Sequence, residues 1–307
     1  HNLGSLTLRS YSTVDVYGGA DIGGGALKNL SIEAAGLGGY LNAGQTATLR
    51  AETVSLSNPN GSVFSNALAL SDGSVPSLGS GGLHIAAQRV LLGKDQKNDA
   101  MTHTLRGFGG GVKFAAAQEI IAGGNSSLEV ESDLTLETTR ITAAPDTGGA
   151  RQNITASGVL NLTQAGAVAD PGQVTALGGY LNFTAKSITH QGRIDLPAGV
   201  VSFTANGADA TDNVTLAAGS QVNAGGFAKN FNDVTAYAPA GSVKLISEHG
   251  DVNVNAGAVV DVSGTEGSDA GQVRVSAAQG QARLAGTVKG SAGNESRSGV
   301  FTLDAGK

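Results

Sequence analysis

Apolar and polar residues alternate along this chain in a short phrase that keeps returning. The phrase is Gly-x-φ-x-φ-x-Ala/Ser, in which φ is apolar. A period of two places the apolar side chains on one face of a strand, and the leading glycine suits a tight turn into it. The full phrase is found as GSLTLRS (4–10), GGLHIAA (81–87), GGVKFAA (110–116), GYLNFTA (179–185), GVVSFTA (199–205), GSVKLIS (241–247), GQVRVSA (271–277) and GVFTLDA (299–305).

Versions without the glycine are KNLSIEA (28–34), QTATLRA (45–51), SSLEVES (126–132) and DNVTLAA (212–218). Several phrases continue as Ala-x-x-Val/Ile and a second short strand. We therefore expect one strand to turn a corner at a small residue and to continue as the next strand.

The spacing between phrases is irregular, with 20 residues from Gly179 to Gly199 and 30 from Gly241 to Gly271. The hexapeptide LGGYLN occurs twice, at 37–42 and 177–182. Repeated strands joined by variable loops predict an all-β fold, a right-handed parallel β-helix (β-solenoid) with loop excursions and roughly 20 to 30 residues per coil. About ten to fourteen coils would make a rod roughly 50–65 Å long.

Breaks in the alternation predict where the chain leaves the core. Residues 95–104 have weak helical character but are polar, so we expect a loop there. No linker divides the chain, which predicts a single β-helix domain over 1–307. The expected excursions are 67–80, 93–109, 143–152, 165–176 and 225–241.

The composition fits a thin core. Aromatic residues are only 4% of the 307 residues, Trp is absent and Gly numbers 47. Stacked Val, Ile, Leu and Ala can fill a solenoid without large rings. The formal net charge of −6 argues against a nucleic-acid partner. No apolar run approaches the ~18 residues of a membrane-spanning segment.

The chain contains no cysteine. Disulfides and thiolate chemistry are therefore impossible, and the absence suits a chain that crosses an envelope unfolded. Both ends run directly into strands, so we expect this sequence to be a piece of a much longer secreted protein.

Pectin-cleaving enzymes share the β-helix fold, so a polysaccharide-cleaving, pectate lyase-like enzyme is the alternative function. It would need several carboxylates in one groove beside a basic residue, for example Asp195, Asp209 and Asp212 with Arg193. The cluster Glu248-His249-Gly250-Asp251 is better explained as a polar turn, and the five histidines lack metal-ligand spacing. We predict no catalytic, cofactor-binding or metal-binding residues.

Two further features have structural explanations. Asn58-Pro59-Asn60-Gly61 matches a type I turn. The five tyrosines could line a carbohydrate-binding face, but we expect ordinary positions on a strand surface. They are Tyr11, Tyr17, Tyr40, Tyr180 and Tyr237.

The repeat style resembles the filamentous haemagglutinin family, large exoproteins of Gram-negative bacteria exported by two-partner secretion. The resemblance rests on GDVNVNAGAVVDVSG (250–264), GQVRVSAAQGQARLAG (271–286) and AETVSLSNPNG (51–61). Residues 58–61 coincide with a short motif of that family's secretion domain, but the surrounding sequence departs from it. The chain therefore resembles part of the central shaft.

This resemblance implies a noncatalytic shaft segment of a secreted or surface-displayed adhesin that mediates adhesion to cells. It implies export through an outer-membrane β-barrel transporter and a cell-surface glycan or protein receptor, without a cofactor. Because the phrases supply the core, we expect recognition to lie in the irregular loops between them.

Overall fold

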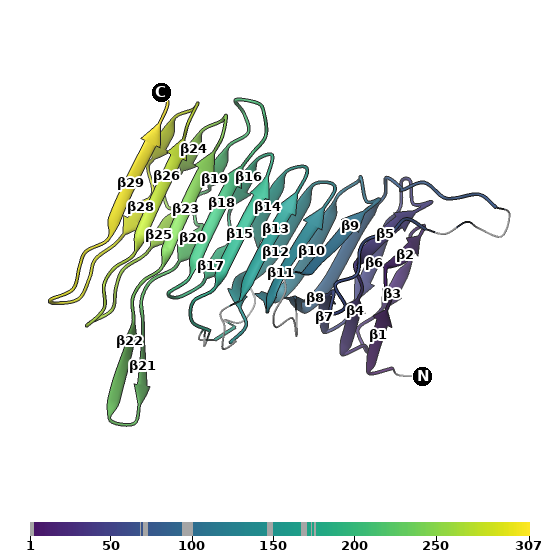
Figure 1. The fold of residues 1–307 in the computed structure, drawn as a ribbon, viewed down its shortest axis with the longest axis horizontal. Coiled ribbons are helices and arrows are strands. Elements are labelled where there is room, and N and C mark those ends of the chain that lie inside the picture. Colours follow the sequence, from purple (N-terminus) through teal and green to yellow (C-terminus); the bar gives the residue numbers. More distant parts are fainter. Residues whose placement is uncertain are drawn as a thin grey trace.

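The protein is a rod of stacked β-strands (Figure 1). The computed structural model describes residues 3–67, 69, 73–93, 101–145, 150–166, 171–172, 174 and 176–307, and these ranges contain strands and turns without a helix. The strands lie side by side from one end of the rod to the other, and the two termini lie at opposite ends.

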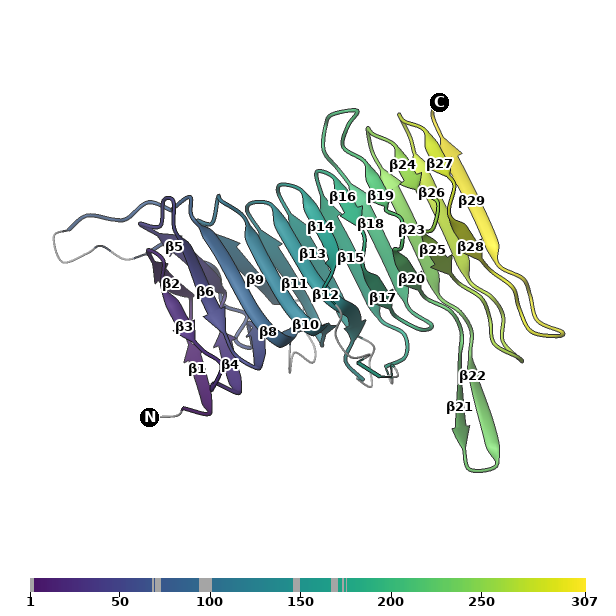
Figure 2. The same ribbon diagram turned by 180° about the vertical axis from the view of Figure 1, so that it is seen from behind.

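One side of the rod is a parallel sheet of ten strands, which we call wall 3. The strands of wall 3 follow one another in chain order, and Figure 2 shows the stacking from behind. Its strands are β2 (Thr13–Tyr17), β5 (Gly36–Tyr40), β9 (Met101–Arg106), β11 (Asn125–Val130), β13 (Arg151–Ala156), β15 (Tyr180–Ala185), β18 (Val200–Ala205), β23 (Ser242–Ser247), β26 (Gln272–Ala277) and β29 (Val300–Ala305).

Seventeen further strands form a continuous parallel sheet, bent along its length into walls 1 and 2. Three long strands cross the bend: β8 (Gly82–Leu92), β10 (Val112–Ala122) and β12 (Leu134–Ala143). The first half of β8 pairs with β6 and its second half with β7.

The remaining strands of these walls are short. Wall 1 also contains β3 (Asp21–Gly23), β6 (Thr46–Arg50), β14 (Leu160–Gln164), β16 (Ile188–His190), β19 (Val214–Leu216), β24 (Val252–Val254) and β27 (Ala282–Leu284). Wall 2 also contains β1 (Ser5–Arg9), β4 (Asn29–Glu33), β7 (Thr53–Ser57), β17 (Arg193–Asp195), β20 (Gln221–Asn223), β25 (Val259–Asp261) and β28 (Thr287–Lys289).

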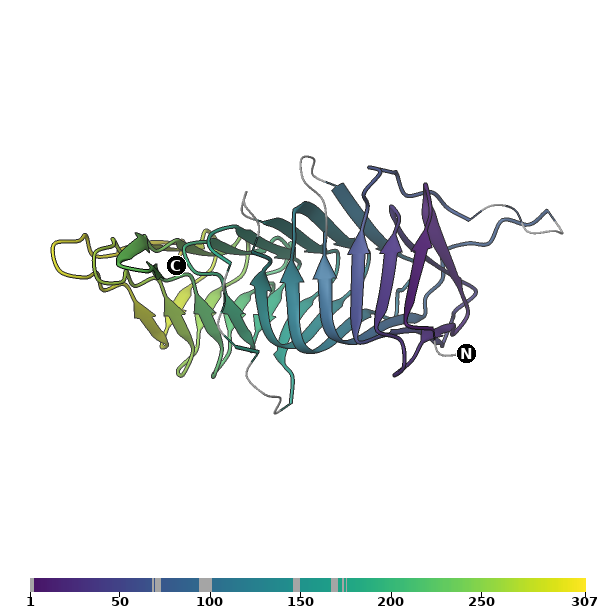
Figure 3. The same cartoon turned by 90° about the horizontal axis from the view of Figure 1, so that it is seen from below.

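This architecture confirms the predicted all-β parallel β-helix with variable excursions. Seen from below, strands of facing walls form rows that run along the molecule (Figure 3). The core lies between the walls and is filled by the alternate apolar residues of the phrases. In β15 and β18, Phe183 and Phe203 are in register and stack with ring centroids 5.2 Å apart.

Each phrase found in the sequence forms or contains a strand, but the phrases do not all lie in the same wall. Early phrases form β1 and β4 of wall 2 and β6 of wall 1, whereas later ones form β15, β18 and β23 of wall 3. The predicted corner at small residues is also observed, since the register of β10 shifts between Ala116 and Glu119 where the strand bends.

Two coils lack a strand in one wall. The coil of β6 and β7 contributes none to wall 3, so β5 pairs directly with β9. The coil of β14 and β15 contributes none to wall 2, so β12 meets β17 through one residue pair, Ile141 with Ile194. At both places the chain makes a predicted excursion.

The prediction that residues 93–109 leave the core is wrong in part. Residues 94–100 lie outside the described ranges, but Met101–Arg106 form β9 in the middle of wall 3. Met101–Thr104 were expected to lie in a loop. His103 occupies a core position, 4% exposed, where the phrase has an apolar residue, which explains why the alternation was not recognised.

The excursion expected at 67–80 begins earlier, at the end of β7. Its first part, residues 58–67, lies over wall 3, and we call it the strap. Thr13 Oγ1 donates to the carbonyl of Ser65 at 2.8 Å and accepts from its N–H at 2.9 Å. The N–H of Ala67 donates to the Tyr40 hydroxyl at 2.8 Å. The strap thus covers the first strands of wall 3.

The strap starts with the predicted turn at Asn58-Pro59-Asn60-Gly61, which is confirmed by a hydrogen bond from the N–H of Gly61 to the carbonyl of Asn58 at 3.2 Å. The Asn58 side chain is buried. Its Nδ2 donates to the carbonyls of Ser62 and Thr102, each at 2.8 Å. Asn58 therefore fastens the strap to β9.

Candidate functional site

An antiparallel hairpin projects from the rod, and it is formed by β21 (Phe227–Phe231) with β22 (Val234–Ala238). It lies between β20 and β23 and extends well beyond the walls (Figure 1). The sequence predicted an excursion at 225–241 but not its strands. Phe231 opposes Val234 at the tip, and Asn232 has a φ of 53°, which suits the tight turn.

The two faces of the hairpin differ because side chains alternate along a strand. One face carries Phe227, Lys229 and Phe231 opposite Ala238, Ala236 and Val234. Phe231 is 54% exposed and Val234 is 61% exposed. The other face carries Tyr237, whose ring lies against Gly267 of the next coil. The apolar tip is therefore open to a partner.

Excursions of the next two coils, 263–271 and 290–299, stack beside the base of the hairpin. The N–H of Gly226 donates to the carbonyl of Ser263, and that of Gly264 to the carbonyl of Ser291, both at 2.8 Å. Arg297 pairs with Asp269 at 2.8 Å. We call the hairpin and these two segments the excursion stack.

The excursion stack has ordered polar contacts at its edge. The pKa of Asp269 lies below its ordinary value because its carboxylate accepts from the N–H and side chain of Arg297. The stack therefore combines exposed apolar residues at the hairpin tip with an ion pair between neighbouring coils.

A second cluster lies on the outer surface of wall 2. Arg193 and Asp195 form an ion pair at 2.6 Å, and Arg140 lies 3.8 Å from Asp195 and also contacts Glu119. Arg140 and Asp195 are each 3% exposed. Arg140 Nη1 donates to the carbonyl of Gly172 at 2.5 Å, so the excursion after β14 covers the cluster.

The four residues that a polysaccharide-cleaving enzyme would need to bring together lie in two separate places. Arg193 and Asp195 meet on β17 of wall 2. Asp209 and Asp212 lie in the loop between β18 of wall 3 and β19 of wall 1, where Asp212 accepts from the N–H of Asp209 at 2.9 Å. Each pair has a local structural role in its own segment.

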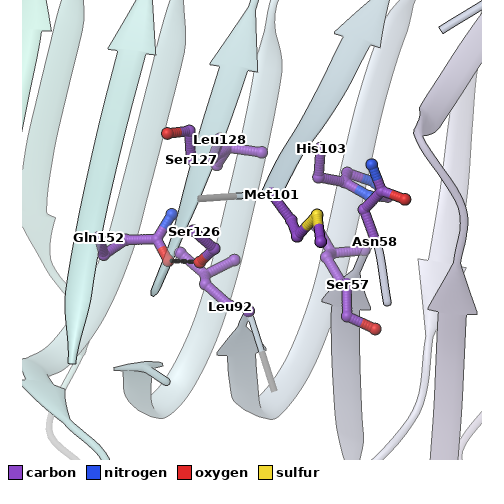
Figure 4. A pocket seen from close by; sticks show the side chains of 11 residues that line it. Ser57, Asn58, Leu92, Met101, His103, Ser126, Ser127, Leu128 and Gln152 are labelled. Carbon is purple, nitrogen blue, oxygen red and sulfur yellow. Dashed lines mark hydrogen bonds between the residues drawn. The ribbon is translucent and has the colours of Figure 1, made fainter. Parts of the chain in front are cut away.

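A small cavity lies where the ends of β7, β8, β9, β11 and β13 converge (Figure 4). Its volume is about 10 Å³, enough for one water molecule. At the lining of this cavity, Ser126 Oγ donates to Gln152 Oε1 at 2.5 Å. The lining residues are Leu56, Ser57, Asn58, Leu92, Gly93, Met101, His103, Ser126, Ser127, Leu128 and Gln152.

Two histidines are buried in the core. His103 Nδ1 lies 3.0 Å from the carbonyl of Ala34, and His190 Nε2 lies 3.2 Å from that of Gln221. Burial lowers the pKa of each imidazole to about 4, against a smaller opposing effect of hydrogen bonds to backbone carbonyls. Both rings are therefore neutral at physiological pH. No three His, Asp or Glu side chains of the described residues converge as metal ligands.

Tyr17, Tyr40 and Tyr180 lie on the outer face of wall 3, but they do not form one exposed surface. Tyr40 is fully buried beneath the strap, contrary to the expected surface position, and its ring centroid lies 5.6 Å from that of Tyr17. Tyr180 lies on wall 3 with the Arg151 guanidinium 3.9 Å from its ring centroid. Tyr237 belongs to the hairpin.

The predicted turn at Glu248-His249-Gly250-Asp251 is confirmed between β23 and β24. Asp251 accepts from the N–H of Gln281 at 2.8 Å, and this bond, with Arg283, lowers the pKa of the carboxyl. His249 Nδ1 lies 3.0 Å from the carbonyl of Gly207. The turn thus joins neighbouring coils.

Within the described ranges the chain forms no helix that could cross a bilayer. Comparison with known proteins finds no matching family model, no matching curated protein and no matching solved structure.

Proposed function

We propose that this chain is a noncatalytic shaft segment of a secreted or surface-displayed bacterial adhesin. The supporting observation is the excursion stack, in which an exposed apolar hairpin tip projects from a continuous rod. Stacked coils make stability roughly additive along the axis, so a rod can hold such a projection far from its point of attachment. Phe231 and Val234 at the tip are accessible to a partner because the hairpin carries them away from the walls.

The repeat style extends the proposal to two-partner secretion in a Gram-negative bacterium. In such a system an outer-membrane β-barrel transporter exports the unfolded chain. Each coil here contacts mainly its neighbours, which favours folding coil by coil as the chain emerges. The absence of cysteine also avoids disulfides that would block export.

Adhesion is tested with beads coated with the 307-residue protein and presented to mammalian and bacterial cells. We expect coated beads to adhere, and the double variant Phe231→Ser/Val234→Ser to lose most of this adhesion. The matched control is Val63→Ser/Val75→Ser, because those valines are also exposed but lie outside the excursion stack. The control should adhere like the unmodified protein.

Two results would overturn the proposal. One is that coated beads adhere no better than uncoated beads to every cell type. The other is that the protein cleaves polygalacturonate, releasing unsaturated or reducing ends, which would favour the polysaccharide-cleaving alternative.

A further inference from the structure

Charged side chains on most of the rod are neutralised between neighbouring coils. Acidic and basic residues that lie one coil apart form ion pairs along walls 1 and 2 and at the excursions. These pairs include Arg9–Glu33, Lys28–Glu52, Arg50–Asp21, Lys113–Glu137, Arg283–Asp251, Lys289–Asp261 and Arg297–Asp269. Stacking in this chain therefore normally places a cation beside a carboxylate.

Wall 3 departs from this pattern between β13 and β26. None of the residues of β13, β15, β18, β23 and β26 is Asp or Glu, although the whole chain has 25 acidic and 19 basic residues. Three outward residues of these strands are cationic: Arg151, Lys244 and Arg274. Among the ion pairs of the described residues, none involves these three.

Lys244 and Arg274 are directly in register on β23 and β26, and both are exposed. Like charges opposite each other in a sheet are destabilising. Neutralisation by a carboxylate, usual elsewhere in the rod, does not occur here. An external anion placed over both cations would relieve the repulsion.

The two cations continue a row of uncharged polar side chains in the same register. The row consists of Ser127, Asn153, Asn182, Ser202, Lys244 and Arg274, on consecutive strands of wall 3. We call it the polar row. Asn182 Nδ2 donates to Asn153 Oδ1 at 2.9 Å, and Asn153 Nδ2 donates to Ser127 Oγ at 3.4 Å. Because strands lie about 4.8 Å apart, the row runs along the axis of the rod.

We propose that the polar row binds a linear acidic polysaccharide lying along the rod. The amides and hydroxyls of Asn153, Asn182 and Ser202 can bond to sugar hydroxyls. Lys244 and Arg274 can bond to carboxylate or sulfate groups in charge-assisted hydrogen bonds. A ligand that repeats along its length can engage several coils at once, so weak contacts add. The biological meaning of this site rests on the proposed adhesive function.

The test uses the full 307-residue protein with dextran sulfate, polygalacturonate and neutral dextran immobilised on beads. We expect binding to at least one acidic polymer at low ionic strength, weakening with salt, and none to neutral dextran. Lys244→Gln/Arg274→Gln should lower the affinity about tenfold. Lys28→Gln/Lys113→Gln, which changes the total charge equally, should stay within about twofold of the unmodified protein.

A charge-neutral variant, Asn182→Ala, should weaken binding by a smaller factor and leave the salt dependence unchanged. Three results would overturn the inference: absence of binding to both acidic polymers, equal binding by Lys244→Gln/Arg274→Gln, or an equal loss in Lys28→Gln/Lys113→Gln. If the protein binds acidic polymers but does not adhere to cells, the polysaccharide site at the polar row is supported and the proposed adhesive function is contradicted.

Discussion

Wall 3 has a covered part and a bare part, and LGGYLN occurs once in each. The first copy, at 37–42, lies beneath the excursion between β7 and β8, which contacts it through Ala67 of the strap and through Gly79 and Gly81. Its Tyr40 and Asn42 are fully buried. The second copy, at 177–182, enters β15 on the bare part, where Asn182 joins the polar row. The same six residues build an interior layer in one place and a surface in the other. The surroundings therefore decide what the motif does.

The glycines of the two copies have different roles, and exchanging them for alanine should give the largest contrast. Gly38 and Gly178 are the first glycines of the two copies. A Cβ on Gly38 would lie 2.7 Å from the ring of the buried Tyr40 and 3.0 Å from its hydroxyl oxygen. Gly178 has open space, with its nearest atom at 3.9 Å, but a φ of +71°. We expect Gly38→Ala to destabilise by about 3 kcal/mol and Gly178→Ala by about 1 kcal/mol.

Urea denaturation followed by intrinsic fluorescence and circular dichroism measures both variants. Hydrogen exchange should show the effect of Gly38→Ala in the first coils and that of Gly178→Ala near β15. Equal losses of stability would contradict the distinction between the two copies.

Acid should weaken the rod through two buried histidines, His103 on β9 of wall 3 and His190 on β16 of wall 1. The pKa of His103 and of His190 is about 4 in the folded protein, below the 6.5 of an unfolded chain. Each neutral histidine therefore contributes fully to the free energy of unfolding above about pH 6.5. This contribution falls by about 3 kcal/mol for each residue as the pH drops towards 4.

Urea denaturation at pH 7.5 and pH 4.5 measures this dependence. His103→Leu and His190→Leu should each remove about half of this pH dependence. Leucine suits both sites because the residues in register on the next strand, Leu128 and Leu216, are leucines. A pH dependence unchanged in both variants would assign the effect to other groups.

The final asparagine of the motif should matter only where it is buried. Asn42 Nδ2 donates to the carbonyl of Gly107 at 2.9 Å, and its Oδ1 accepts from the N–H of Gly81 at 3.0 Å. Asn42→Ala leaves both groups unpaired and should cost about 2 kcal/mol. Asn182→Ala should change the free energy of unfolding by less than about 0.5 kcal/mol. Urea denaturation measures both variants. A larger loss of stability in Asn182→Ala than in Asn42→Ala would contradict the expectation that only the buried asparagine stabilises the fold.

The tyrosine hydroxyls should show the same contrast at smaller scale. Tyr40→Phe removes the acceptor for the N–H of Ala67 and should cost about 1 kcal/mol. Tyr180→Phe keeps an aromatic ring over Arg151 and should be nearly neutral. The midpoints of urea denaturation measure both, and a neutral Tyr40→Phe would show that the strap adds little to stability.

The apolar alternation was enough to predict the fold, because stacking needs only inward apolar residues and small residues at corners. It could not predict which wall a phrase occupies, since every wall uses the same pattern. It missed β9 because His103 stands at an inward position. It missed the burial of Tyr40 because Ala67, the strap residue that contacts its hydroxyl, lies 27 residues away in sequence.

The sequence predicted where the candidate site lies along the chain, but it did not predict the structure of the site. Irregular spacing indicated that 225–241 leaves the core, but the strands of the hairpin carry no regular phrase. The polar row depends on register across coils, which irregular loop lengths conceal. Lys244 and Arg274 are thirty residues apart in sequence and adjacent in the sheet.

The missing strand of wall 2 has a mechanical consequence. Between β12 and β17 the wall is joined by a single residue pair, while Arg140 bridges Glu119 and Asp195 across the joint. Elsewhere neighbouring strands share several backbone hydrogen bonds. Under tension along its axis, the rod is expected to yield first at this joint, where ion pairs replace the ladder of backbone bonds.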